Sequence, residues 1–104
     1  MNTKPTKENI SPLARLILEG AYLVDVRTPE EFMFGSVPGA VNIPLFTVPL
    51  RVEDFRDKDN IIVFCQSGAR SSQAKMFLEQ SGISCVTNGG GWYEVDEAFH
   101  EVNE

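Results

Sequence analysis

Histidine and cysteine are scarce in this sequence. Its 104 residues include one histidine and two cysteines, too few for a disulfide framework. These three side chains, His100, Cys65 and Cys85, show no short metal-ligand spacing, so we expect no metal site. His100 also lies far from Cys65 along the chain, which argues against a Cys–His catalytic pair.

A basic cluster and a long hydrophobic run are also absent. The formal net charge is −6, which argues against nucleic acid and anionic membranes as partners. No apolar run approaches the ~20 residues that cross a bilayer. Residues 1–8 lack the apolar centre of a signal peptide. We therefore expect a flexible tail at residues 1–8, a single domain at residues 9–104 and a cytoplasmic location.

Strand-like and helix-like segments alternate along the chain. Apolar runs predict strands at residues 22–26, 41–43, 61–64 and 83–87. Caps and helical spacing predict helices that begin near Pro12, Glu30, Leu45, Ser71 and Trp92. Ser11 is the predicted cap of the first, and Thr28 and Glu31 form a predicted capping box at the second. The helix over residues 45–55 is expected to be irregular because of Pro49. Ile10 is a candidate for a brief edge strand, and residues 88–91 are expected to form a loop. This alternation predicts an α/β fold with helices on both faces of a parallel sheet.

One segment places a cysteine between a buried strand and a helix. The apolar run at residues 61–64 leads directly into Cys65, and helical spacing resumes after Arg70. Ligands bind at the carboxyl ends of strands in open α/β sheets, and anions bind at helix N-termini. Cys65 therefore occupies a suitable place for a nucleophile.

The residues after Cys65 favour its thiolate form. A free cysteine has a pKa of about 8.5, and a helix N-terminus or a nearby cation lowers it. Arg70 supplies a positive charge, and Ser67 and Ser71 supply short hydrogen-bond donors. Gly68 allows the positive φ that a ring of backbone amides requires. We expect these groups, and not a histidine, to activate Cys65. Cys85, inside the predicted strand at residues 83–87, is expected to pack in the core.

Three blocks of sequence resemble the rhodanese-like sulfurtransferases, in particular their short single-domain members of the phage-shock type. The blocks run from Asp25 to Phe32, from Gly35 to Pro44, and from Cys65 to Ser71. Their order and spacing make the resemblance specific, and it covers the chain from about Ile10 to Trp92.

The resemblance implies a fold and a set of roles. The fold would be a parallel sheet of about five strands with helices on both faces. Cys65 would be the catalytic residue and would become a persulfide. The residues that would hold its sulfur, by backbone amides and charge, are Gln66, Ser67, Gly68, Ala69, Arg70 and Ser71. Asp25 and Arg27 would form an ion pair that supports the loop. Gly90 and Gly91 match a glycine pair that lies close to the active loop in the family.

The predicted function is that of a thiosulfate sulfurtransferase. A sulfane sulfur would pass from thiosulfate or a similar donor, through a Cys65 persulfide, to a thiol or cyanide acceptor, without a cofactor. Gln66 is neutral where many thiosulfate-using members carry a cation, which weakens the attraction for an anionic donor.

Two other functions are compatible with the same loop. The domain could be a sulfur carrier or a binding module for a partner protein, with a sulfur-relay protein as one candidate partner. A cysteine-based phosphatase or arsenate reductase is a weaker alternative. Those enzymes have five residues between Cys and Arg, whereas only residues 66–69 lie between Cys65 and Arg70.

Overall fold

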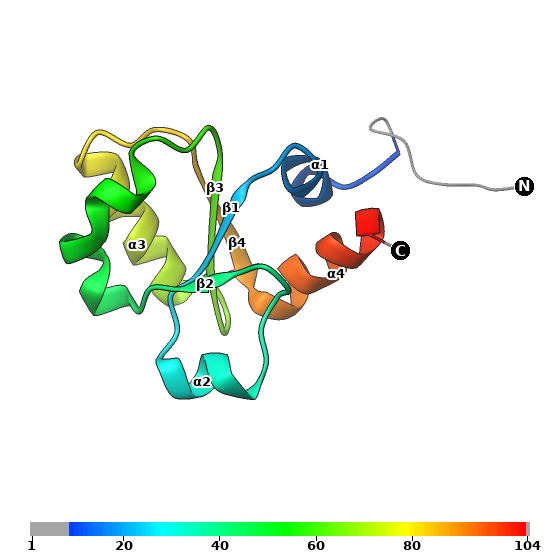
Figure 1. Cartoon of the computed structure of the whole chain (residues 1–104), viewed down its shortest axis with the longest axis horizontal. Helices are drawn as coiled ribbons and strands as arrows, with labels where there is room; N and C mark the ends of the chain where they lie inside the picture. The colour runs from blue at the N-terminus through cyan, green and yellow to red at the C-terminus, as the bar shows by residue number, and fades with distance from the viewer. Residues whose placement is uncertain (1–8, 104) are drawn as a thin grey trace, which may run out of the picture.

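The computed structural model describes residues 9–103, and within them a parallel sheet lies between two helical layers (Figure 1). The four strands are β1 (Tyr22–Asp25), β2 (Val41–Asn42), β3 (Ile61–Cys65) and β4 (Val86–Gly91), in the order β2-β1-β3-β4. The helices are α1 (Pro12–Leu18), α2 (Pro29–Phe34), the 3₁₀ segment η1 (Leu45–Phe55), α3 (Ala69–Gln80) and α4 (Trp92–Asn103). The predicted α/β class is confirmed, and the tail predicted at residues 1–8 lies outside the described residues.

Strand β3 runs through the centre of the molecule and is buried on both faces. Ile61, Val63 and Cys65 pack with the layer formed by α3 and η1. Ile62 and Phe64 point to the opposite face, which α1 and α4 cover (Figure 1). This alternation is what a continuous apolar strand in a parallel sheet requires. No helix in residues 9–103 is long and apolar enough to span a membrane.

Local signals explain where several helices begin. The Ser11 side chain accepts a hydrogen bond from the amide of Ala14 at 3.1 Å, which caps α1. Thr28 and Glu31 form the predicted capping box at the start of α2. The segment η1 is irregular as predicted, with a kink at Arg51.

The last strand lies further along the chain than predicted. Residues 88–91, expected to be a loop, form the last four of the six residues of β4 and pair with the end of β3. A Cβ atom on Gly89 would lie 2.6 Å from Val95 Cγ2 and 2.9 Å from Ile62 Cγ2. Glycine is therefore needed there for α4 to approach the sheet. This close approach outweighs the low strand propensity of glycine.

Two further sequence predictions are wrong. Cys85 precedes β4 and is exposed, so it does not pack in the core. Its carbonyl accepts a hydrogen bond from the amide of Ile61, which fixes the backbone but not the side chain. Ile10 does not form an edge strand, because its side chain is buried against Ala14 of α1 and Ala98 of α4.

Candidate active site

Cys65 ends β3 at the edge of the sheet where α2 and the N-termini of α3 and α4 converge (Figure 1). It is buried, with 1% of its surface exposed. Gly68 caps α3 with φ +102°, in the left-handed region expected for this position. That conformation turns the Gly68 amide back so that it donates a hydrogen bond to Cys65 Sγ at 3.0 Å. The turn therefore brings a buried sulfur against a backbone donor.

Two opposing influences set the pKa of the Cys65 thiol. Burial raises this pKa, because the thiolate loses its hydration. Hydrogen bonds from the Ser71 hydroxyl and from the amides of Ser71, Ser67 and Gly68 lower it further than burial raises it. The result is a pKa of about 7, against an ordinary value of 9.0. Near neutral pH, a substantial fraction of Cys65 is therefore the nucleophilic thiolate.

Hydrogen bonds through Ser71 and Asn88 connect Cys65 to β4 behind the loop. The buried Ser71 hydroxyl lies 3.5 Å from Cys65 Sγ and donates to Asn88 Oδ1 at 2.7 Å. The Asn88 side chain also donates to the Gly68 carbonyl at 3.1 Å and accepts from the Gly90 amide at 2.9 Å. Sequence reasoning missed Asn88 because it assigned this residue to a loop.

Arg70 is held by a carboxylate from another element. Its guanidinium makes a two-point ion pair with Glu31 of α2, at 2.8 and 3.1 Å. Hydrogen bonds from Arg70 and from the Thr28 amide are the main causes that lower the pKa of Glu31 to about 2. The hydrogen bond to Glu31, with a smaller contribution from Cys65, raises the pKa of Arg70. The positive charge of Arg70 is thus largely offset, and Glu31 is a site residue that the sequence revealed only as a helix cap.

Asp25 and Arg27 form a buried ion pair with a 2.7 Å contact. Asp25 also accepts a hydrogen bond from the Ser36 hydroxyl at 2.7 Å. Arg27 donates to the Gly35 carbonyl at 2.6 Å, and its guanidinium lies 5.0 Å from the centre of a Trp92 ring. The pair therefore joins the end of β1 to the end of α2 and to the start of α4.

The remaining loop residues form the rim. Gln66, Ser67 and Ala69 are exposed. A Cβ atom on Gly91 would lie 2.7 Å from the Gln66 carbonyl oxygen, so the end of β4 packs directly against the loop. Of the predicted site residues, Gly68 and Ser71 contact Cys65 Sγ directly, whereas Asp25 and Arg27 pair with each other at the end of β1.

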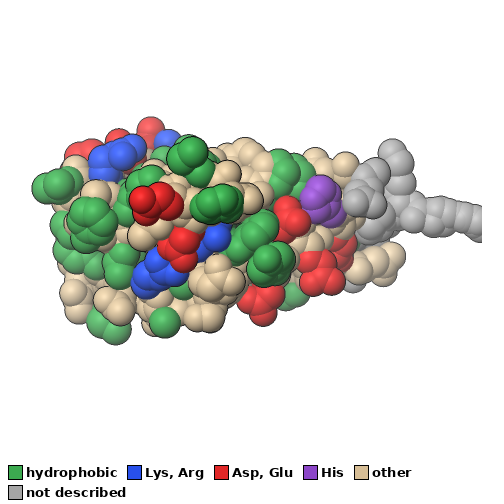
Figure 2. Space-filling model, turned by 90° about the horizontal axis from the view of Figure 1, so that it is seen from below, with side chains coloured by type: hydrophobic (Ala, Val, Ile, Leu, Met, Phe, Trp, Pro, Cys, Tyr) green, Lys and Arg blue, Asp and Glu red, His purple; other side chains and the backbone are tan. Residues whose placement is uncertain are grey.

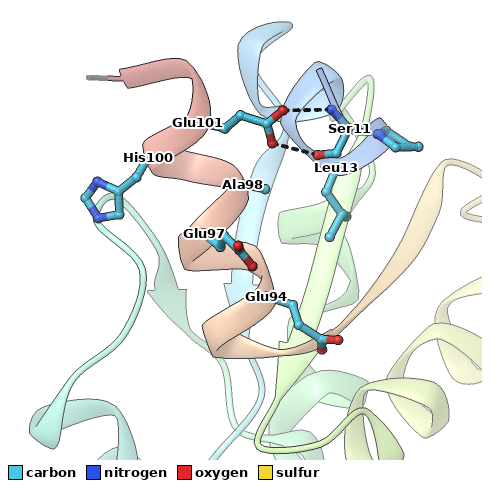
Figure 3. A pocket seen from close by; sticks show the side chains of 8 residues that line it. Ser11, Leu13, Glu94, Glu97, Ala98, His100 and Glu101 are labelled. Carbon is cyan, nitrogen blue, oxygen red and sulfur yellow. Dashed lines mark hydrogen bonds between the residues drawn. The ribbon is translucent and has the colours of Figure 1, made fainter. Parts of the chain in front are cut away.

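A separate surface hollow of about 700 Å³ lies between α1 and α4 (Figure 3). Two of its three acidic side chains, Glu94 and Glu101, already serve structural contacts. Glu101 accepts from the Ser11 amide and hydroxyl at 3.0 Å, and Glu94 accepts from the Gly91 amide at 2.6 Å. Among residues 9–103, no group of three His, Cys, Asp or Glu side chains could hold a metal ion.

Comparison with known proteins agrees with this geometry. The chain matches the family described as Rhodanese-like domain over residues 10–98. The chain belongs to this family. Rhodanese-like relatives include a sulfurtransferase of Allochromatium vinosum, 39% identical over 67% of this chain and 65% of its own length. The thiosulfate sulfurtransferase PspE of Escherichia coli is 37% identical over 76% of this chain and 78% of its own length.

Solved structures show the same rhodanese-like fold. A human single-domain sulfurtransferase superposes with a TM-score of 0.71 at 29% identity, covering 82% of this chain and 89% of its own. A rhodanese-like domain protein from Staphylococcus aureus has a TM-score of 0.70 at 31% identity, covering 90% and 91% of the two chains. The family predicted from the three sequence blocks is confirmed.

Proposed function

We propose that this protein is a thiosulfate-type sulfurtransferase that acts through a persulfide on Cys65. The observation that carries the proposal is a buried cysteine, with a thiol pKa of about 7, held against the first turn of α3. The names of relatives such as the E. coli thiosulfate sulfurtransferase support the reaction class.

The first half-reaction forms the persulfide. The Cys65 thiolate attacks the outer sulfur of thiosulfate or a similar sulfane donor, and a new sulfur–sulfur bond forms. The donor's own sulfur–sulfur bond breaks, and its electron pair leaves with sulfite. Cys65 then carries one additional sulfur, which bears the negative charge. No metal or cofactor takes part in this step.

The second half-reaction releases the sulfur. A thiolate or cyanide attacks the outer sulfur of the persulfide, and the electrons of the broken bond return to Cys65. The amide of Gly68, already 3.0 Å from the sulfur, is positioned to stabilise the thiolate that appears in this step. The enzyme thus alternates between a free and a sulfur-loaded form.

The other predicted residues receive roles from their positions. We assign substrate binding, through loop amides and charge, to Gln66, Ser67, Gly68, Ala69, Arg70 and Ser71. The buried pair of Asp25 and Arg27 supports the elements around the loop. A loop with only four residues between Cys65 and Arg70 suits a single sulfur atom better than a phosphate.

Mass spectrometry after incubation with thiosulfate tests the proposal. The expected result is one added sulfur on the wild type and on Cys85→Ser, and none on Cys65→Ser. Cys85→Ser is the matched control because Cys85 is the other free cysteine and is exposed. If the wild type gains no sulfur, or if Cys65→Ser still gains it, the proposed reaction is wrong.

The preference for thiosulfate is tested by adding the missing cation. Gln66→Arg should lower the KM for thiosulfate, because the Arg70 charge is already offset by Glu31. Gln66→Met, which keeps the length but adds no charge, is the control. An unchanged KM in Gln66→Arg would show that charge at this position does not govern donor binding.

A second candidate function is that of a sulfur carrier between proteins. Large apolar side chains gather on the face that carries α2 and η1 (Figure 2). Among them, Met33, Phe34, Phe46 and Leu50 are between 78% and 95% exposed. Exposed apolar groups of this kind mark protein interaction sites more often than small-anion sites. A Bacillus subtilis relative, 36% identical over 67% of this chain and 38% of its own length, is named as a sulfur carrier protein.

The two candidates differ in the donor that loads Cys65. Loading from a persulfidated cysteine desulfurase that is faster than loading from thiosulfate would favour the carrier. Phe34→Ser should then slow protein-to-protein transfer and leave loading from thiosulfate unchanged. Leu18→Ser, at an exposed position on α1, is the control. Equal effects of the two substitutions would count against docking through α2.

A further inference from the structure

We propose that Asn88 is a positioning residue that directs the hydrogen of the Ser71 hydroxyl and thereby tunes the reactivity of the Cys65 sulfur. The inference rests on the proposed role of Cys65 as the nucleophile. Asn88 lies on β4, outside the loop that the sequence marks as the site.

Two backbone groups fix the orientation of the Asn88 side chain. The Gly90 amide can only donate, so the atom 2.9 Å from it must be the side-chain oxygen. The Gly68 carbonyl can only accept, so the atom 3.1 Å from it must be the side-chain nitrogen. The amide group of Asn88 therefore cannot be reversed without losing both contacts.

This orientation determines what Ser71 does with its single hydroxyl hydrogen. Asn88 Oδ1 has no hydrogen, so at 2.7 Å the Ser71 hydroxyl must be the donor. Ser71 then turns an oxygen lone pair toward Cys65 Sγ, 3.5 Å away. A neutral Cys65 thiol can donate its hydrogen to that lone pair. A thiolate at the same place accepts from the Gly68 amide but has no hydrogen to accept from the Ser71 hydroxyl in this orientation.

For the Ser71 hydroxyl to stabilise the Cys65 thiolate, it must therefore rotate. Its hydrogen leaves Asn88 and turns to the sulfur, while Asn88 Oδ1 keeps the hydrogen bond from the Gly90 amide. Asn88 and the thiolate compete for one hydrogen. When a persulfide forms, the charge moves to the outer sulfur, and the hydrogen can return to Asn88. The hydroxyl rotation thus follows the charge on Cys65 through the proposed reaction.

The charged groups around the site are engaged with other partners and do not take over the role that we propose for Asn88 and Ser71. Arg70, the cation that acts on Cys65, is paired with Glu31 from α2. Asp25 and Arg27 at the end of β1 are paired with each other. Glu94 of α4 is engaged with the Gly91 amide. Ser71 is the buried side-chain hydroxyl within hydrogen-bonding range of the sulfur.

The pH dependence of Cys65 alkylation by iodoacetamide tests the inference. A Cys85→Ser background leaves Cys65 as the single thiol. Asn88→Ala should lower the thiol pKa by about half to one unit, the equivalent of one net hydrogen bond, because Ser71 is free to donate to the thiolate. Asn88→Asp should raise the thiol pKa, because its carboxylate holds the Ser71 hydrogen and adds a like charge.

The double variant separates this role from simple support of the loop. With Ser71→Ala, the additional Asn88→Ala substitution should no longer lower the thiol pKa. The inference is overturned if Asn88→Ala leaves the pKa unchanged or raises it, or if the same decrease persists without the Ser71 hydroxyl. If Asn88→Ala does not fold, Asn88→Asp is used for the test instead. A Cys65 thiol pKa in Asn88→Asp at or below the wild-type value then overturns the inference.

These titrations use no sulfur donor. A failure of sulfur loading on Cys65 would contradict the proposed function and leave the alkylation result intact. A thiol pKa that is insensitive to Asn88 would contradict the inference and leave sulfur loading intact.

Discussion

The ion pair between Arg70 and Glu31 joins the first turn of α3 to α2, and Glu31→Gln removes its negative partner. The lowered pKa of Glu31, about 2 against 4.5, would correspond to roughly 3 kcal/mol if water did not screen the pair. The two side chains are 34% and 35% exposed, so we discount this to about 1 kcal/mol of folding stability.

The contribution of Glu31 to folding stability should depend on pH in a defined direction. Its pKa is lower in the folded than in the unfolded protein, so its stabilising effect is fully present above a pH of about 4.5 and is lost as the pH falls toward 2. The stability difference between wild type and Glu31→Gln should be about 1 kcal/mol near pH 7 and should shrink near pH 3. Urea unfolding followed by Trp92 fluorescence measures it.

The matched control is Glu79→Gln, which breaks an exposed pair with Lys75 on α3. Pairs of this kind contribute about 0.3–0.5 kcal/mol. The reasoning fails if the two substitutions cost the same, or if the effect of Glu31→Gln does not change with pH. The same variant also leaves the Arg70 charge without its partner, so the KM for thiosulfate should fall.

Three other outcomes are expected. The alkylation rate of Cys65 should reach half its maximum near pH 7, and a midpoint near 9 would contradict the hydrogen bonding of the loop. Gly91→Ala should destabilise the fold by about 1–3 kcal/mol and slow sulfur loading, because the added Cβ would lie 2.7 Å from the Gln66 carbonyl oxygen. Unchanged loading kinetics would disprove this contact. Cys85→Ser should change the free energy of unfolding by less than about 0.5 kcal/mol and leave sulfur transfer unchanged, since Cys85 is exposed; a larger loss would assign this side chain a structural role.

Local signals predicted the elements that depend on local interactions. The Thr28 and Glu31 capping box, the Ser11 cap and the buried run before Cys65 each act within a few residues of the chain. Their positions could therefore be read from the sequence. The positive φ of Gly68 was predictable for the same reason, because a strand-to-helix turn requires it.

The elements that depend on distant contacts could not be placed from the sequence. Residues 88–91 are strand because β3 pairs with them and because α4 packs closely over Gly89. Glu31 and Arg70 are 39 positions apart, and Asn88 and Ser71 are 17 apart. No periodicity or spacing rule connects such pairs. The sequence thus pointed to the proposed nucleophile and its loop but not to the side chains that neutralise and orient them.

The burial of Cys65 determines which sulfur of the proposed persulfide an acceptor can reach. With 1% of the residue exposed, the inner sulfur is shielded by the loop, and an added outer sulfur is expected to lie closer to the acceptor. Attack on the inner sulfur would release sulfide and leave a mixed disulfide, which would inactivate the protein. Attack on the outer sulfur regenerates the free thiolate. In the proposed reaction, shielding of Sγ would therefore set the regiochemistry of the transfer and protect the sulfur-loaded protein from being trapped by surrounding thiols.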